Sequence, residues 1–469
     1  MALVAGVDSS TQSCKVVIRD LSSGAIVRTG SASHPEGTEV DPEAWLSALE
    51  AAIDRAGGLE DVSAISIAAQ QHGLVALDSL GRVVRPALLW NDTRSASSAD
   101  DLIAELGRSR FVEATGSVPV ASFTISKLRW LRDNEPELAS RVAAVALPHD
   151  WLTWRMRGFG PEGQSELGPD FAELATDRSD ASGTGYFNSR TNAYDTELFE
   201  AALGHQAALP RLVAPGGQVG TDQAGRIYGP GAGDNAGAAL GLNMTPGDVA
   251  ISIGTSGTVF AITKRQAQDE SGMIAGFADA AGSFLSIGVT LNAARVLKNG
   301  ADLLGVDFDE LSTLALSAQP GASGLVLVPY FEGERTPNLP QAKARLHGMS
   351  LESTTRQNLA RAYVEGMLCG LAFGLDALCA QGVEVQRIFL IGGGSQNQAV
   401  KKVATTLFDY PIVIPRVSEY VAEGAAAQAA WVLTGIPPEW PIELADELVP
   451  DIAPKVRLQY EEATSSVQG

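Results

Sequence analysis

The clearest chemical signal in this chain is a carboxylate in a glycine-rich turn, followed by a loop of small hydroxylated residues. Asp234 follows the turn at 229–233, and an expected strand at 249–253 leads into the loop Gly254-Thr255-Ser256-Gly257-Thr258. A carboxylate in a close-fitting turn can accept a proton from an alcohol, and such a loop can surround phosphate with N–H groups and hydroxyls. The combination predicts phosphoryl transfer from a nucleotide to a hydroxyl.

A second acidic residue stands at the end of the first expected strand. Asp8 follows residues 3–7 and precedes the hydroxyl-rich run 9–13, with Lys15 on the returning strand. A tight hairpin turn of this kind can hold phosphates, while the carboxylate holds Mg²⁺ directly or through water. A plain hairpin turn with a capping aspartate explains the same residues when they are taken alone. The second loop at 254–258 favours the phosphate site.

Three further segments carry residues that suit a ligand, and each has a structural alternative. The glycines 392–394 end an expected strand at 387–391 and would let an adenine or ribose approach the backbone, or would make a tight strand-to-helix turn. Asn397 would reach that ligand or cap a helix beginning near Ser395. Gln71 and His72 follow a buried strand at 64–68, where side chains face the ligand crevice of an α/β sheet. His72 would bind a sugar hydroxyl or serve a structural role.

Asp234 also has a structural alternative. An Asp-Asn pair after glycines often forms a turn or a helix N-cap, and residues 236–240 read as the start of a helix. A general base at a helix N-terminus is compatible with that placement.

The expected elements around these residues occur twice. The chain opens with strands at 3–7, 15–19 and 25–29, and a helix capped by Asp41 follows. In the second half, strands at 249–253 and 258–262 again flank a hydroxyl-rich turn. This pattern predicts two α/β domains of related design that face one cleft, one covering residues 1–242 and the other residues 243–469.

Composition excludes several partner classes. The net charge of −21 disfavours nucleic acid and anionic lipid, and the three cysteines fit buried thiols of a reducing compartment. The N-terminus reads as a first strand, and no apolar run is expected to be long enough to cross a bilayer. A long helix is expected over 358–380, where glycines recur every fourth residue and charged residues favour close packing in a core over a membrane dimer. The expected location is therefore the cytoplasm.

With these features the chain resembles the FGGY family of carbohydrate kinases along essentially its whole length. Residues 122–134 match one long family signature, and residues 344–349 and 358–365 nearly match a second. The resemblance implies two actin-like, ribonuclease H-type ATPase domains with an interdomain cleft. It implies that residues 1–242 bind the sugar and supply the catalytic base, while residues 243–469 bind the nucleotide.

The resemblance also implies roles for individual residues. Asp234 would be the general base, and Asp8 would hold Mg²⁺. The expected contacts to the substrates are Gln71, His72 and Asn235 for the sugar, Thr11, Gln12, Lys15, Gly254, Thr255 and Ser256 for the phosphates of ATP, and Gly393, Gly394 and Asn397 for adenosine.

Within the family the likeness is greatest to bacterial members that phosphorylate D-xylulose, on 71–73, 89–92, 233–235 and 333–337. A kinase for another ketose or polyol, such as ribulose, glycerol or fuculose, and a non-catalytic actin-like ATP-binding protein are the alternatives. The sequence leaves the oligomeric state, including a homodimer, open.

Overall fold

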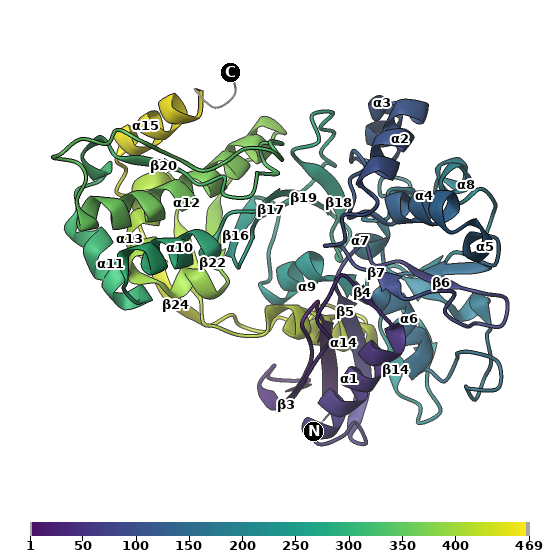
Figure 1. Cartoon of the computed structure of the whole chain (residues 1–469). Coiled ribbons are helices and arrows are strands. Elements are labelled where there is room, and N and C mark those ends of the chain that lie inside the picture. The colour runs from purple at the N-terminus through teal and green to yellow at the C-terminus, as the bar shows by residue number, and fades with distance from the viewer. Residues whose placement is uncertain (1, 466–469) are drawn as a thin grey trace.

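The computed structural model describes residues 2–465 and has two lobes, each built around a seven-stranded sheet (Figure 1). The first sheet has the order β13-β14-β5-β1-β2-β3, with β15 also pairing with β5. Its strands are β1 Leu3–Ser9, β2 Ser13–Asp20, β3 Ile26–Ser33, β5 Val62–Ala69, β13 Gly220–Thr221, β14 Ile227–Tyr228 and β15 Ala232–Gly233.

The second sheet has the order β18-β19-β17-β16-β22-β23-β24. Its strands are β16 Asp248–Ile253, β17 Gly257–Thr263, β18 Ala275–Ala278, β19 Phe284–Thr290, β22 Arg387–Ile391, β23 Ile412–Pro415 and β24 Leu444–Leu448. The remaining strands form pairs: β4 Glu39–Val40 with β7 Ala87–Leu88, β6 Val75–Leu77 with β8 Ala144–Ala146, β9 Ala175–Thr176 with β12 Arg211–Leu212, β10 Phe187–Asn188 with β11 Ala193–Tyr194, and β20 Val326–Val328 with β21 Arg345–His347.

The two sheets repeat one arrangement of strands. In the first, β1 and β2 form an antiparallel hairpin, β3 continues it, and β5 lies parallel to β1 on its other edge. In the second, β16 and β17 form the hairpin, β19 continues it, and β22 lies parallel to β16. The domain-scale duplication predicted from the sequence is therefore confirmed in the topology, and both hydroxyl-rich turns connect the strands of the corresponding hairpins.

Helices cover the sheets and connect them (Figure 1). The helices that precede the second sheet in the sequence are α1 Pro42–Arg55, α2 Ala96–Leu106, α3 Arg108–Thr115, α4 Thr124–Asn134, α5 Pro136–Ala139, α6 Pro148–Met156, α7 Arg178–Ala181, α8 Thr196–Leu203 and α9 Asp234–Gly241. The later helices are α10 Ala294–Leu304, α11 Phe308–Ser317, α12 Arg356–Ala380, α13 Gln398–Leu407, α14 Tyr420–Thr434 and α15 Pro454–Ser465.

Local sequence signals set the ends of α1 and α13. Asp41 caps α1 by accepting a hydrogen bond of 3.0 Å from the Glu43 backbone N–H, as predicted. The helix expected to begin near Ser395 instead begins at Gln398, because a short 3₁₀ turn at Gly393–Gln396 comes first. Asn397 caps that helix, and its Oδ1 accepts from the N–H groups of Ala399 and Val400 at 3.0 and 3.1 Å.

Helix α14 comes from the C-terminal part of the chain but packs on the first sheet, against β1 and β5 (Figure 1). It also crosses α9 so closely that a Cβ on Gly424 would lie 1.9 Å from the Gly237 carbonyl oxygen. The chain thus crosses between the lobes after α9, before α14 and after α14. The division at residue 242 stays a prediction, and the first lobe includes this later helix.

Helix α12 is long and apolar enough to cross a membrane, so the expectation that no apolar segment has sufficient length is wrong. Most of its apolar window, 78%, is buried inside the protein. Close packing explains one of its recurring glycines, because a Cβ on Gly366 would lie 2.3 Å from the Leu327 carbonyl oxygen. Burial of this kind is typical of a core helix.

Candidate active site

The two aspartates singled out in the sequence flank the carboxyl end of strand β5. Strand β1 pairs with one edge of β5, placing Asp8 opposite Ala68, and β15 pairs with the other edge, placing Gly233 opposite Ala69. Asp234 follows Gly233 directly. Two strand spacings, about 10 Å, separate the backbones of β1 and β15. The structure therefore brings both carboxylates to the same end of the first sheet.

Asp8 is a buried carboxylate without a hydrogen-bonding partner on one oxygen. The residue is 6% exposed, and its Oδ1 has no partner within residues 2–465. Burial raises the pKa of Asp8 to about 7, with Lys15 opposing the shift and the charge of Asp234 adding to it. A desolvated carboxylate of this kind is costly unless a cation or a proton neutralises it.

The surroundings of Asp8 fit Mg²⁺ better than a metal that needs several protein ligands. No group of three or more His, Cys, Asp or Glu side chains in residues 2–465 could enclose a metal ion. A cation at Asp8 would take its other ligands from water and from phosphate oxygens. Mg²⁺ is commonly bound by one or two carboxylates together with waters and phosphates.

Asp234 is the first residue of α9, and Gly233 is the N-cap. Its Oδ1 accepts from the backbone N–H and the side-chain Nδ2 of Asn235, at 2.7 and 2.8 Å. Burial raises the pKa of Asp234 to about 6, although the hydrogen bonds from Asn235 oppose the shift. A carboxylate with a pKa near neutrality is suited to accept a proton from a hydroxyl.

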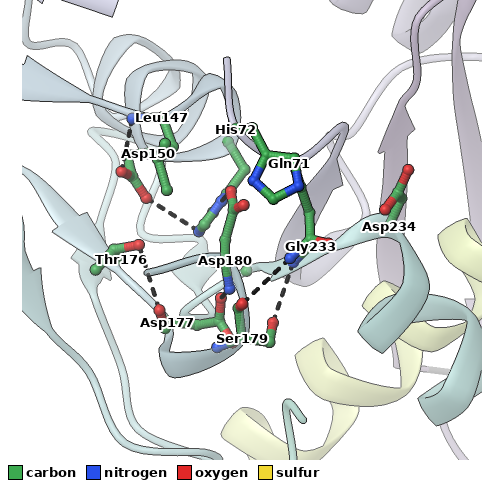
Figure 2. A network of polar contacts seen from close by, with 12 residues as sticks. Gln71, His72, Leu147, Asp150, Thr176, Asp177, Ser179, Asp180, Gly233 and Asp234 are labelled. Atoms are coloured by element: carbon green, nitrogen blue, oxygen red, sulfur yellow. Dashed lines mark hydrogen bonds and ion pairs between the residues drawn. The ribbon is translucent and has the colours of Figure 1, made fainter. Parts of the chain in front are cut away.

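A buried polar network supports the loop that carries Asp234 (Figure 2). His149 lies at its centre, with Nδ1 2.7 Å from Asp180 Oδ2 and Nε2 3.1 Å from Asp150 Oδ1. Burial alone would lower the pKa of His149, but these carboxylates outweigh burial and raise it to about 10. Ser179, the residue before Asp180, connects this network to the loop, because its Oγ accepts a hydrogen bond of 3.1 Å from the Gly233 backbone N–H. Asp234 itself lies beyond Gly233 and points away from the network (Figure 2).

Helix α14 holds the same loop from the other side. The Gln428 side chain is buried, and its Oε1 accepts from the Gly231 N–H at 2.9 Å while its Nε2 donates to the Gly231 carbonyl at 2.8 Å. Ser66 donates a third hydrogen bond to Gln428 Oε1. Gly231 has a φ of 84°, and a Cβ there would lie 2.1 Å from His149 Cδ2, so only glycine fits this position. The backbone before Asp234 is thus fixed on both faces.

Replacing Asp180 tests whether His149 is a buried cation. Asp180→Asn should lower the free energy of unfolding by about 3 kcal/mol, because it leaves the imidazolium with less compensation in a buried site. Urea denaturation measures this change. The exposed ion pair of Asp61 with Arg28 supplies a control, since Asp61→Asn should leave the free energy of unfolding nearly unchanged. An Asp180→Asn variant as stable as the unmodified protein would show that His149 is neutral.

A cavity of about 280 Å³ lies beside Asp234 and is lined from both lobes. The structure places five of the predicted residues on its wall: Gln71, His72, Asp234, Asn235 and Ser256. Apolar side chains of the second lobe, including Met273, Ile274 and Phe277, complete the wall together with Arg335. A mostly apolar wall with a few convergent polar groups is typical of a small-molecule site.

His72 faces this cavity as a neutral imidazole. Its Nδ1 lies 2.6 Å from the Gly183 carbonyl oxygen, so Nδ1 carries the proton and Nε2 is left as an acceptor. Burial lowers the pKa of His72 to about 3, and the charges of Lys127 and Arg335 add to the effect. The ring stacks on Phe123 with centroids 4.8 Å apart. A fixed neutral imidazole can accept a hydrogen bond from a sugar hydroxyl.

A second cavity, of about 420 Å³, lies at the carboxyl ends of β16 and β22. It brings together five predicted nucleotide contacts: Gly254, Thr255, Gly393, Gly394 and Asn397. Ser256, the next residue of the same turn, lines the cavity beside Asp234 instead. The turn at 254–256 therefore lies between the two cavities, where a phosphate chain passing from one to the other would contact it. Asn397 Oδ1 caps α13, and its Nδ2 donates a hydrogen bond of 3.4 Å to the Phe308 carbonyl oxygen, so both ends of this side chain have partners.

The remaining predicted phosphate contacts line neither cavity. Thr11 Oγ1 accepts a hydrogen bond of 2.8 Å from Trp90 Nε1, and Gln12 is exposed. Lys15 forms an ion pair of 2.5 Å with Glu419. The structure thus gives Lys15 a carboxylate partner in place of a free cationic head, and the assignment of Thr11, Gln12 and Lys15 to phosphate stays a prediction.

Sequence reasoning gave no role to Arg335 and missed the network around His149. The motif 333–337 stands out in the sequence, but nothing in its residue types shows that its arginine lines the cavity beside Asp234. His149 and Asp180 lie in separate helices, α6 and α7. A basic and an acidic residue far apart in the sequence carry no signal of contact.

Comparison with known proteins agrees with this geometry. The N-terminal domain model of the FGGY family of carbohydrate kinases matches residues 3–236, and the C-terminal domain model matches residues 249–433. Xylulose kinase from Streptomyces rubiginosus is 44% identical over 455 residues, which cover 93% of this chain and 89% of that protein.

Solved structures give the same result for the fold. The crystal structure of xylulose kinase from Bifidobacterium adolescentis has a TM-score of 0.93 at 44% identity and covers 99% of each chain. Plasmodium falciparum glycerol kinase with ADP has a TM-score of 0.86 at 19% identity over 100% of this chain and 98% of that one, and shows the fold alone. The predicted actin-like ATPase fold is thereby confirmed. On both domain matches and on its relatives, the chain belongs to the FGGY family of carbohydrate kinases.

Proposed function

We propose that this kinase transfers the γ-phosphoryl group of ATP to D-xylulose, giving ADP and D-xylulose 5-phosphate. Membership of the family makes ATP the phosphoryl donor. The sugar is supported by relatives named xylulose kinase at 44% identity over most of the chain. The main structural support for this reaction is the turn at 254–256, whose residues line both the cavity beside Asp234 and the cavity at Gly393 and Gly394.

The mechanism follows from where the charges form. The primary hydroxyl of the sugar, bound near His72 and Asn235, attacks the γ-phosphorus in line. Asp234 accepts the hydroxyl proton, and N–H groups of the 254–256 turn stabilise charge on the phosphoryl oxygens. Asp8 would hold Mg²⁺, which neutralises phosphate charge when bound. Because the site is lined from both lobes, closure of the lobes would exclude water before transfer.

The cellular context is part of the same proposal. A sugar kinase of this family that uses ATP would act in the cytoplasm, where its cosubstrate is made available. Whether the chain forms a homodimer stays a prediction, to be measured by sedimentation of the purified protein.

A panel of acceptors tests the proposed function. D-Xylulose, D-ribulose, L-ribulose, glycerol and L-fuculose are compared by sugar-dependent ADP release. D-Xylulose should give the highest kcat/KM, by at least ~10-fold, because acceptors with differently placed hydroxyls leave buried polar groups unpaired. A preference for another acceptor would assign the chain to a different sugar within the family. ATP binding without sugar-dependent ADP release would identify a non-catalytic protein.

A further inference from the structure

The wall of the cavity beside Asp234 includes one positively charged side chain, and general-base catalysis by Asp234 gives it no role. Of the residues on the wall, only Asp234 and Arg335 carry full charges, because His72 is neutral. Arg335 lies on the segment between β20 and β21, in the second lobe, whereas Asp234 belongs to the first. The positive charge of Arg335 helps to lower the pKa of His72. The guanidinium therefore faces the sugar side of the site from across the cleft.

The Arg335 backbone is held in place, and the side chain has no anionic partner among the described residues. Its backbone N–H donates to Glu334 Oε1 at 2.8 Å, and that buried carboxylate also accepts from Leu291 N–H, Thr290 Oγ1 and Asn292 Nδ2 at 2.7, 2.7 and 2.9 Å. Both Glu334 oxygens therefore accept hydrogen bonds from neighbouring groups and are not paired with the Arg335 guanidinium. Within residues 2–465 the Arg335 guanidinium has no ion pair or hydrogen bond, and burial lowers its pKa. Arg335 is half-buried, so its guanidinium keeps access to the cavity and can take an anion as its partner.

The other positive charges near the site are absent or already used. Within the described part of the chain, no lysine or arginine lines the cavity at Gly393 and Gly394. Lys15, next to the turn after β1, is paired with Glu419, and the buried Lys127 Nζ donates to the carbonyl oxygens of His72 and Ser122. Among the described residues, Arg335 is thus the basic side chain on the cavity wall that has no partner.

We propose that the Arg335 guanidinium binds the phosphoryl group as it passes to the sugar and retains it as the phosphate of the product. This inference rests on the proposed function. In the step, the bond from the sugar oxygen to the γ-phosphorus forms while the bond from that phosphorus to the β,γ-bridging oxygen breaks. ADP leaves with the electron pair, and the sugar proton moves to Asp234. A planar guanidinium can donate two parallel hydrogen bonds to the phosphoryl oxygens throughout this transfer.

The placement explains why the cation belongs to the second lobe. Thr336 Oγ1, on the residue after Arg335, lies 3.4 Å from the Met273 carbonyl oxygen, and Met273 is itself part of the cavity wall. The segment that carries Arg335 is therefore linked to this wall, and both line the cavity beside Asp234. An arginine supplied to a phosphoryl-transfer site from a separate element is a known means of stabilising transition-state charge.

Arg335→Gln and Arg335→Lys test the proposal in the full-length enzyme. Arg335→Gln should lower kcat about 10²-fold, while the KM for D-xylulose changes less than about 3-fold, because the contact forms with the phosphoryl group and not with the free sugar. Titration calorimetry should show the dissociation constant of D-xylulose 5-phosphate rising at least ~10-fold, with that of D-xylulose unchanged. Arg335→Lys should recover part of kcat, since it restores the charge without the two-pronged geometry.

Arg356→Gln is the matched control, because Arg356 is an exposed arginine of the same lobe, 3.6 Å from Glu310. It should leave kcat and product affinity unchanged. A raised KM for D-xylulose with unchanged kcat would overturn the proposal, since it would place Arg335 on a sugar hydroxyl. Unchanged affinity for the sugar phosphate in Arg335→Gln would also overturn it. If the unmodified enzyme prefers another acceptor, the proposed function fails, and the same comparison is made with that acceptor and its phosphate.

Discussion

Asp234→Asn is expected to fold normally and to lose sugar phosphorylation by roughly 10²- to 10⁴-fold, the range for removal of a general base. The amide keeps the size of the side chain and its position at the start of α9, but it cannot accept the hydroxyl proton. The loss should therefore appear in kcat, with binding of D-xylulose and ATP little changed. A coupled assay of ADP release measures the rate, and calorimetry measures binding.

The pH profile gives an independent check on the same residue. The pKa of Asp234 is raised to about 6, so that the carboxylate is the reactive form above pH 6 and is lost by protonation below it. The kcat/KM of the unmodified enzyme should fall on the acid side in the range of pH 6 to 7, where Asp8 also titrates. In Asp234→Asn the contribution near pH 6 should disappear.

The control for Asp234→Asn is Asp302→Asn, which removes an exposed carboxylate that pairs with Lys298 on α10. It should retain full activity. Full turnover in Asp234→Asn would contradict the assignment of the base.

Asp8→Asn is expected to lower kcat by about 10³-fold, because the neutral amide holds a cation poorly and charge on the phosphoryl oxygens would be less well stabilised. The pKa of Asp8 is raised in the folded protein, so the folded state binds more protons than the unfolded state, and the carboxylate costs stability as the pH rises toward 7. The variant should therefore be at least as stable as the unmodified protein at pH 8 without magnesium. Lost activity would then reflect lost chemistry.

Thermal unfolding with and without Mg²⁺ and ADP separates the two effects of Asp8→Asn. Mg²⁺ should enhance the stabilisation by ADP in the unmodified protein and in Asp302→Asn, but much less in Asp8→Asn. An equal effect of Mg²⁺ in all three proteins would show that Asp8 does not hold the metal.

Local signals in the sequence were sufficient for the strands and turns that position the site. Apolar strands ending in glycine and hydroxyl residues predicted both hairpins and the strand at 387–391, whose observed bounds are Arg387–Ile391. These elements depend on neighbours in the chain, so their residue types specify them. The two aspartates were identified for the same reason, since each follows a strand or a turn that the sequence shows directly.

The parts that escaped prediction depend on contacts between distant segments. The placement of α14 on the first sheet follows from close approach of Gly424 to Gly237, and the bonds between Gln428 and Gly231 follow from that placement. A glutamine among alanines gives no sign that it will bind a backbone 197 residues away. The ion pair of Lys15 with Glu419, 404 residues distant, likewise depends on a contact that the local sequence does not show.

A crystal structure of the unmodified enzyme with D-xylulose, ADP, Mg²⁺ and aluminium fluoride would show whether Asp234 contacts the reacting hydroxyl. We expect an Asp234 carboxylate oxygen within about 2.6–3.2 Å of the primary hydroxyl of the sugar. We also expect the fluoride group between that hydroxyl and the turn at 254–256. A sugar bound with its hydroxyls away from Asp234, or a nucleotide whose phosphates avoid that turn, would show that this mechanism is wrong.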